Sequence, residues 1–277
     1  MPETSATRTR LRALYADAVT MVRARVGWTE FVLLGALFVA AAGLWGFAAI
    51  VDEVLEGDVH EFDQTIMLAL RSPLDTADPI GPPALEMAMR DITALGGFTV
   101  ITLIGMIVVG YLVILRRWPS VILVLVSLIG GTILNTVLKN AFARPRPDLV
   151  AHLVDVHTAS MPSGHAMISA VTYLTIGALL ARVQPSRALK VYTVLVSVTL
   201  VLVIGLSRVY LGVHWPTDVL SGWCLGAAWA MTCWLAAQGA SLYLGGAQRL
   251  PFSAETPVGR TDTADRRVPD APATADR

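Results

Sequence analysis

Six long apolar blocks, separated by polar stretches, dominate the chain. Each block is close to the length of about 20 residues that a helix needs to cross a hydrocarbon core, and most of its interruptions are small residues that allow close packing of membrane helices. The pattern predicts an all-α polytopic membrane protein with six transmembrane helices in a bundle. The expected spans are residues 29–51, 96–115, 119–138, 165–183, 191–207 and 219–244.

The connection between the first two spans, residues 52–95, is long for a segment without structure of its own. Phe62, Ile66 and Leu70 recur at a spacing of four, whereas Asp63 falls on another side of the same helix. This periodicity predicts a short amphipathic helix. Two placements remain open, one in the plane of the outer membrane interface and one packed on the outer end of the bundle.

Polar segments flank the membrane domain, which is expected to cover residues 29–244. Residues 1–28 are rich in arginine, and the apolar run after them is longer than the core of a signal peptide, so it is interpreted as an uncleaved anchor. Residues 245–277 have the composition of a disordered tail. Placing both termini in the cytoplasm puts most of the 21 lysines and arginines on the cytoplasmic side of a plasma membrane, as the positive-inside rule requires.

Composition supports this class of protein and excludes others. Hydrophobic residues make up 55% of the chain and charged residues 15%, and the mean hydropathy is +0.61. A soluble domain carries about 25% charged residues and 45–50% apolar residues. The chain is more apolar and less charged than this, and its composition excludes a disordered, a collagen-like and a disulfide-stabilised protein. The formal net charge is zero, and no basic field indicates a nucleic-acid partner.

Four of the six basic residues on the predicted outer side fall in two short segments between spans: Lys139, Arg144, Arg146 and Arg208. A cationic cluster against an apolar bundle requires an anion or an acidic partner. Snorkelling of one side chain to the interface would account for Lys139 alone. The prolines on either side of Arg146 restrain the backbone that carries it.

Residues 162–165 read Pro-Ser-Gly-His and directly precede a predicted span. The start of a helix presents free backbone N–H groups and the positive end of the helix dipole, which together suit a phosphate. Gly164 allows the backbone to approach such a group, and the Ser163 hydroxyl can donate a further hydrogen bond.

A third segment carries Arg208, His214 and Asp218. Pro216 suits the first turn of the last span, and at a spacing of four the Asp218 carboxylate can accept a hydrogen bond from one ring nitrogen of His214. The other nitrogen would then be unprotonated, as in an oriented nucleophile. The pair is a weak signal alone, but together with His165 and the cations it indicates phosphate chemistry.

The three segments together resemble the signature of the type 2 phosphatidic acid phosphatase family, which is related to the vanadium haloperoxidases and glucose-6-phosphatase. That signature reads Lys-x6-Arg-Pro, Pro-Ser-Gly-His and Ser-Arg-x5-His-x3-Asp, and the chain matches it in order. The resemblance implies that His214 attacks phosphorus, that Asp218 orients His214, and that His165 protonates the leaving oxygen and then activates water. It assigns the remaining signature residues to phosphate binding: Lys139, Arg146, Ser163, Gly164 and Arg208.

The function implied is hydrolysis of a lipid phosphate or diphosphate at the outer membrane face, through a phosphohistidine and without metal or cofactor. Three cations can neutralise a phosphate without Mg²⁺. Undecaprenyl diphosphate, phosphatidylglycerophosphate and phosphatidic acid all remain candidate substrates, and nothing indicates the oligomeric state. The alternatives are a vanadate-dependent haloperoxidase-like enzyme and a non-catalytic protein that binds or transports lipid phosphates.

Arg144, His152 and His157 lie in the loops near the signature residues but are not part of the signature. Arg144 is interpreted as a solvated loop charge, with a contact to a lipid head group or a second phosphate as the alternative. His152 and His157 are interpreted as ordinary loop residues, because no metal-ligand partners accompany them at a useful spacing.

Overall fold

The structure is a computed structural model in which residues 28–243 are described. The predicted N-terminal segment, apart from Trp28, and the predicted C-terminal tail lie outside the described residues. The elements in chain order are α2 (Trp28–Glu56), α3 (His60–Ala69), β1 (Arg71–Ser72), β2 (Asp75–Pro79), α4 (Pro83–Ala94), α5 (Phe98–Ile114), α6 (Trp118–Phe142), α7 (Gly164–Val183), α8 (Arg187–Tyr210) and α9 (Pro216–Tyr243).

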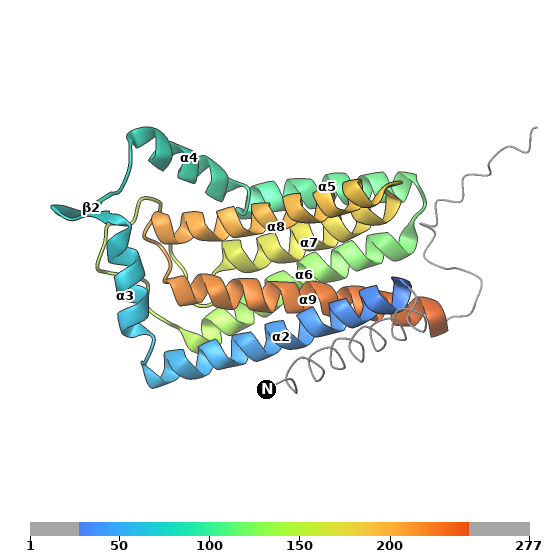
Figure 1. Cartoon of the computed structure of the whole chain (residues 1–277), viewed down its shortest axis with the longest axis horizontal. Coiled ribbons are helices and arrows are strands. Elements are labelled where there is room, and N and C mark those ends of the chain that lie inside the picture. The colour runs from blue at the N-terminus through green and yellow to red at the C-terminus, as the bar shows by residue number, and fades with distance from the viewer. Residues whose placement is uncertain (1–27, 244–277) are drawn as a thin grey trace, which may run out of the picture.

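Each predicted span overlaps one long helix, and the helices lie side by side in a bundle (Figure 1). Within the described part of the chain, five helices are long and apolar enough to cross a membrane: α2, α6, α7, α8 and α9. Helix α5 has only 17 residues and passes the same test only together with α4, from which it is bent by 47°. The bundle therefore has five candidate spans, or six if the bent pair counts as one.

Helices α7 and α9 form the interior of the bundle. Helix α7 packs against α6, α8 and α9, and α2 packs along α9. A Cβ atom at Gly226 of α9 would lie 2.6 Å from the backbone oxygen of Met167 in α7. The absence of a side chain at this position therefore allows the two helices to approach closely, as small residues do between membrane helices.

The outer surfaces of the long helices are apolar. Phe38 and Trp45 on α2 and Ile114 on α5 are among the large hydrophobic side chains that are mostly exposed. An exposed apolar surface that continues over several helices is unusual for a protein surrounded by water. It suits contact with lipid, as the sequence pattern predicts.

The short helix predicted in the long connection is α3, and it packs on the end of the bundle. Met67 is fully buried in a cluster with Trp215 and Val219, and Ile66 packs against that cluster. Of the two placements considered, the structure shows this one. The assignment of Asp63 to the polar side was wrong, because Asp63 is fully buried against other elements.

The fold is mostly helical, as predicted, and it contains one short β-hairpin that the sequence analysis did not predict. Strands β1 and β2 pair antiparallel, with Arg71 opposite Pro79 and Ser72 opposite Asp75. The hairpin is too short to produce a periodic pattern in the sequence. A tertiary contact holds the hairpin, since Nη1 of Arg71 donates a hydrogen bond to the backbone oxygen of Tyr210 in α8 at 2.9 Å.

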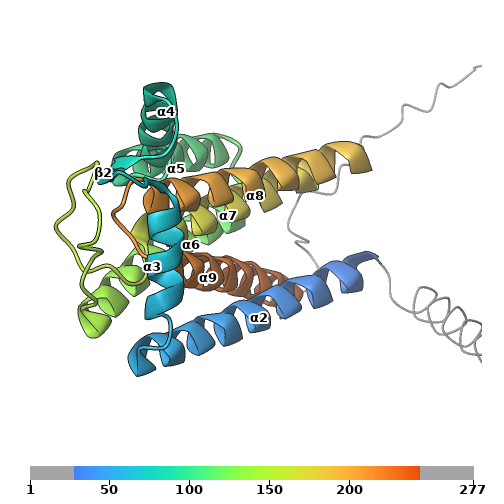
Figure 2. The same ribbon diagram turned by 60° about the vertical axis from the view of Figure 1, so that its left-hand side comes forward.

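Several connections gather at one end of the bundle, which we call the α3 end. It carries α3, the hairpin, the start of α4 and the segments 143–163 and 211–215 (Figures 1 and 2). The α5–α6 and α7–α8 connections and both ends of the described chain lie at the opposite end (Figure 1). All three motif segments therefore meet at the α3 end.

Candidate active site

The structure brings His214 and Asp218 together at the start of α9. His214 lies in the connection that follows α8, and its Nδ1 is 3.4 Å from Oδ2 of Asp218 in the first turn of α9. Its Nε2 is 3.3 Å from Nη1 of Arg146. A guanidinium can only donate, so Nε2 accepts here and the ring hydrogen resides on Nδ1, facing the carboxylate. The lone pair on Nε2 therefore faces Arg146.

Burial governs the protonation of His214, which is only 2% exposed. Burial lowers the pKa of His214 from 6.5 to about 3, and the charges of Arg146 and Arg208 act in the same direction. The hydrogen bond with Asp218 and its charge oppose this change and raise the pKa. The imidazole is therefore neutral at neutral pH, as a nucleophile must be.

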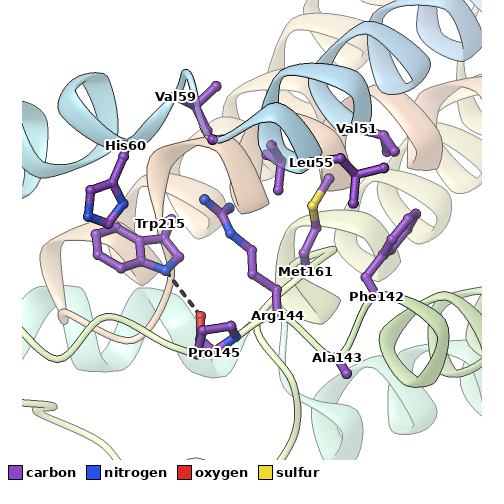
Figure 3. Close-up of a pocket in the computed structure, with 12 residues that line it drawn as sticks. Val51, Leu55, Val59, His60, Phe142, Ala143, Arg144, Pro145, Met161 and Trp215 are labelled. Atoms are coloured by element: carbon purple, nitrogen blue, oxygen red, sulfur yellow. Dashed lines mark hydrogen bonds between the residues drawn. The ribbon is translucent and has the colours of Figure 1, made fainter.

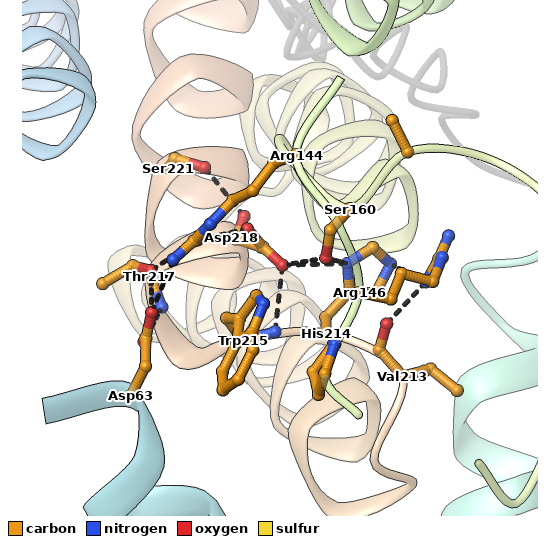
Figure 4. Close-up of polar contacts among 12 residues, drawn as sticks. Asp63, Arg144, Arg146, Ser160, Val213, His214, Trp215, Thr217, Asp218 and Ser221 are labelled. Atoms are coloured by element: carbon orange, nitrogen blue, oxygen red, sulfur yellow. Dashed lines mark hydrogen bonds and ion pairs between the residues drawn. The ribbon is translucent and has the colours of Figure 1, made fainter. Parts of the chain in front are cut away.

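Two further donors hold the Asp218 carboxylate, and sequence reasoning missed both. The backbone N–H of Trp215 donates to Oδ2 at 2.9 Å, and the Ser160 hydroxyl donates to the same oxygen (Figure 4). Ser160 is fully buried and lies three residues before Ser163. A lone serine in a polar loop gives no sequence signal for such a contact.

Lys139 and Arg146 belong to the first motif segment, and Arg208 belongs to the third. Lys139, in the last turn of α6, donates from Nζ to the backbone oxygen of Ala159 at 2.5 Å. Arg146 donates from Nε to the backbone oxygen of Thr158 at 2.8 Å and from Nη1 to that of Val213 at 2.5 Å. These bonds connect the first motif segment to the loops that carry the other two.

Arg208, near the end of α8, is the most deeply buried of the three cations. It is 3% exposed, and its Nη1 donates to the Thr93 hydroxyl of α4 at 3.0 Å. Its Nε is buried and has no hydrogen-bond partner among the described residues. Thr93 is a supporting residue that the sequence did not reveal, because α4 is distant from α8 along the chain.

Residues 163–165 lie at the start of α7, which begins at Gly164. Ser163 precedes the helix, and its hydroxyl is buried without a hydrogen-bond partner among the described residues. A Cβ at Gly164 would lie 3.7 Å from Cε of Lys139, so the glycine backbone faces the lysine. The first N–H groups of a helix have no partner within it. An oxyanion needs several hydrogen-bond donors around it. The hydroxyl of Ser163, the Nε of Arg208 and the first N–H groups of α7 can provide such donors.

His165 lies in the first turn of α7, among the same groups. It interacts electrostatically with His214 and with each of the three signature cations. A Cβ at Gly96, in the turn between α4 and α5, would lie 3.4 Å from both Cβ and Cδ2 of His165. The bend between α4 and α5 therefore lies directly against this histidine.

Arg144 differs from both interpretations given by the sequence. Its guanidinium pairs with Asp218 at 2.6 Å and with Asp63 at 2.9 Å, and its side chain is only 13% exposed. It is neither a solvated loop charge nor a group free to bind a head group. The sequence could not show this, because Asp63 lies 81 positions earlier in the chain.

The remaining histidines stay apart from the cluster. His152 is exposed, and its Nε2 lies 2.7 Å from the backbone oxygen of Pro147, and His157 is an exposed loop residue. His60 is exposed on α3, with its ring 5.9 Å from that of Trp215. Over residues 28–243, no group of three or more His, Cys, Asp or Glu side chains is arranged to hold a metal ion.

A cavity of about 340 Å³ adjoins the cluster. Its walls come from the end of α2, the end of α6 and the loops beside the site, and most of them are apolar (Figure 3). Leu55 and Phe142 face it from the two helices, and Arg144 and Trp215 separate it from Asp218. The Trp215 indole is fixed by donation to the backbone oxygen of Pro145 at 3.1 Å.

Comparison with known proteins identifies the family. Residues 120–241 match the PAP2 superfamily, a stretch that contains all three motif segments. The chain is 41% identical over 152 residues to phosphatidylglycerophosphatase B of Bacillus subtilis, covering 53% of this chain and 72% of that protein. The chain belongs to the PAP2 superfamily. The family predicted from the three motif segments is thereby confirmed.

Other PAP2 proteins extend the likeness. The chain is 31% identical over 126 residues to undecaprenyl-diphosphatase of Sulfolobus acidocaldarius, covering 43% of this chain and 57% of that protein. The crystal structure of a transmembrane PAP2-type phosphatidylglycerolphosphate phosphatase from Bacillus subtilis superposes with a TM-score of 0.59 at 27% identity, covering 76% of this chain and 97% of that one. This PAP2 protein is a multi-pass membrane phosphatase.

Proposed function

We propose that this PAP2 protein hydrolyses a lipid phosphate or diphosphate through a phosphohistidine formed on His214, without a metal ion. The observation that carries the proposal is the arrangement of His214, with Nδ1 facing Asp218 and the lone pair of Nε2 facing Arg146. Binding of a phosphate alone would not require an ordered, neutral imidazole beside its own carboxylate. Phosphoryl transfer does require one, together with fixed cations around the phosphate.

The reaction has two steps. In the first, Nε2 of His214 forms a bond to phosphorus, the bond from phosphorus to the lipid oxygen breaks, and His165 gives that oxygen a proton. In the second, His165 takes a proton from water, the water oxygen bonds to phosphorus, and the phosphorus–nitrogen bond breaks. Phosphate leaves and His214 is neutral again. The cations and the donors of Ser163 and Gly164 hold the phosphate oxygens throughout.

Support for a lipid substrate comes from the surroundings of the site. The cluster lies at one end of an apolar bundle, and a neighbouring cavity of about 340 Å³ is lined mostly by apolar side chains, among them Leu55 of α2 and Phe142 of α6. A lipid can keep its chains against the exposed apolar surfaces of the long helices while its phosphate reaches the cations at their end. The named relatives act on phosphatidylglycerophosphate and undecaprenyl diphosphate, and we propose a substrate of this class.

We propose that the α3 end faces the outside of the plasma membrane. Basic residues at the opposite end include Arg116, Arg117, Arg187 and Lys190, whereas acidic residues are concentrated around α3. The positive-inside rule places the basic end in the cytoplasm. Both termini would then also be cytoplasmic.

The proposal is tested with purified protein in detergent and a panel of lipid phosphates: undecaprenyl diphosphate, phosphatidylglycerophosphate and phosphatidic acid. We expect phosphate release from at least one of them, at the same rate with and without EDTA, because three side-chain cations supply the charge that a metal would bring. Loss of activity with EDTA that returns on adding Mg²⁺ would contradict the metal-independent mechanism. The substrate with the highest kcat/KM identifies the lipid.

The pH dependence follows from His214. Since burial lowers its pKa to about 3, the free enzyme keeps a neutral nucleophile as the pH falls through 6.5, the ordinary value for histidine. We expect kcat/KM, corrected for the ionisation of the substrate phosphate, to show no acid-side loss centred near 6.5. An acid limb centred near 6.5 would contradict the assigned state of His214.

A further inference from the structure

A buried row of alternating charges links α3 to the start of α9. The Arg144 guanidinium lies between two carboxylates, with Nη2 at 2.9 Å from Oδ2 of Asp63 and Nη1 at 2.6 Å from Oδ1 of Asp218 (Figure 4). Both carboxylates are fully buried. Arg144 falls on a position that the first family motif leaves unspecified, and Asp63 lies outside both the motifs and the stretch that matches the superfamily.

Thr217, the residue before Asp218, is part of the same network. Its backbone N–H donates to Oδ1 of Asp63 at 2.9 Å, and its hydroxyl donates to Oδ2 of Asp63 at 2.6 Å. Asp63 therefore caps the first turn of α9, a position usually served by a side chain of the helix itself or of the residue just before it. A carboxylate is also favoured there by the helix dipole. The cap holds the backbone that carries Asp218.

Arg144 fixes the other side of the Asp218 carboxylate. Oδ2 accepts from Trp215 and Ser160 and faces His214, whereas in the described part of the chain Arg144 is the donor to Oδ1. Arg144 is itself held, since its Nη1 also donates to Thr217 at 2.8 Å and its Cζ lies 5.8 Å from the centre of the Trp215 ring. The orientation of the carboxylate toward His214 thus depends on a residue that does not touch His214.

We propose that Arg144 and Asp63 are positioning residues for phosphoryl transfer, acting on His214 through Asp218. The inference rests on the proposed function of His214 as nucleophile. When Nε2 bonds to phosphorus the imidazole becomes positively charged, and a carboxylate held ionised and aimed at Nδ1 stabilises that charge. Asp63 in turn keeps Arg144 between the two carboxylates and fixes the helix start.

Stability alone is a poor reason for such a network. Taking three charged groups out of water is costly, and buried ion pairs are often replaced by apolar side chains without loss of stability. The network also lies immediately beside the proposed nucleophile rather than elsewhere in the bundle. The position of the network indicates that its role is to orient the Asp218 carboxylate.

The test compares Arg144→Gln, Arg144→Lys and Asp63→Asn with wild type. We expect Arg144→Gln to lower kcat by about 10- to 100-fold, the usual effect of removing a group that orients a reacting residue. KM and inhibition by inorganic phosphate should change little, because Arg144 is not placed to hold the phosphate. Arg144→Lys should restore part of kcat, since it keeps the charge but not the two-pronged geometry, and Asp63→Asn should cause a smaller loss.

Matched controls separate positioning from a general loss of charge. Glu61→Gln removes an exposed carboxylate from α3, two residues before Asp63, and Arg90→Gln removes an exposed guanidinium of α4. Both should retain wild-type kcat. Thermal unfolding in detergent is measured for every variant, so that a decrease in folded protein is not taken for a decrease in kcat.

The double variant Asp63→Asn with Arg144→Gln gives the sharpest result. A pair that served only the fold would be relieved by removing both charges, and Tm and kcat would recover together. For positioning residues we expect Tm to recover while kcat stays low, because Oδ1 of Asp218 still lacks its cation. Recovery of kcat to the wild-type value, or wild-type kcat in Arg144→Gln, would overturn the inference.

The same assay distinguishes this inference from the proposed function. If His214→Ala retains turnover, the phosphohistidine mechanism itself fails. If His214→Ala is inactive while Arg144→Gln and Asp63→Asn turn over like wild type, only the positioning role fails. Arg144→Lys keeps the comparison interpretable if removal of the charge prevents folding.

Discussion

Replacing His214 with alanine is expected to lower kcat by about 10⁴- to 10⁶-fold, the range found when a covalent nucleophile is removed. The Nδ1 atom of His214 faces the Asp218 carboxylate, and its Nε2 faces Arg146 with a free lone pair. Phosphate release from the preferred lipid measures the effect. His152→Ala, which removes an exposed imidazole of the neighbouring loop, is the matched control and should retain wild-type turnover.

The same variant separates the candidate functions. An enzyme with His214 as nucleophile should lose hydrolysis on substitution while still binding inorganic phosphate through its cations, and wild type should form an acid-labile phosphoenzyme that the variant lacks. A binding or transport protein would show no turnover in the wild type. A haloperoxidase-like enzyme would oxidise bromide once vanadate is added. Unchanged lipid hydrolysis by His214→Ala would refute the assigned nucleophile.

Replacing Arg208 with glutamine is expected to lower kcat by about 10²- to 10³-fold, equivalent to about 2.7–4 kcal/mol of transition-state stabilisation for a preorganised donor. Arg208 is 3% exposed, it is anchored by Thr93, and its Nε is a buried donor without a partner in the described structure. A charge held in this way needs no reorganisation when negative charge develops on the phosphate oxygens.

Two companion variants sharpen this result. Arg208→Lys keeps the charge but loses the planar fork, so its kcat should lie between those of wild type and Arg208→Gln. Thr93→Val keeps the whole guanidinium and removes only its anchor at 3.0 Å, so the loss should be smaller still. Inhibition by inorganic phosphate should weaken in the same order. Equal kcat in wild type and Arg208→Gln would show that Arg208 does not contact the phosphate.

The sequence predicted the helices well because their signal is local. An apolar run of about 20 residues determines a membrane helix by itself, since every backbone group must be paired within the segment. Each predicted span accordingly overlaps a helix of the bundle. Prediction from local pattern was insufficient at α5, because its apolar run is short. Only the tertiary structure shows that α4 and α5 follow each other with a bend of 47°.

In the candidate site, too, local contacts were predictable from the sequence and long-range contacts were not. The contact of His214 with Asp218 was foreseeable, because four positions at the start of a helix bring two side chains to one face. The positions of Ser160 and Thr93 were not, because their partners lie 58 and 115 positions away along the chain. A polar side chain in a loop has the same sequence signature whether it faces water or a buried carboxylate.

Asp63 shows most clearly what tertiary structure adds. By its spacing it belongs to the polar side of an amphipathic helix, yet it is fully buried and paired with Arg144. The sequence by itself determined the helices and the family and indicated the residues proposed for phosphoryl transfer, because these depend on local pattern and short motifs. Only the folded chain decided which charges are paired and which remain open to an anion, because that depends on contacts between segments far apart in the sequence.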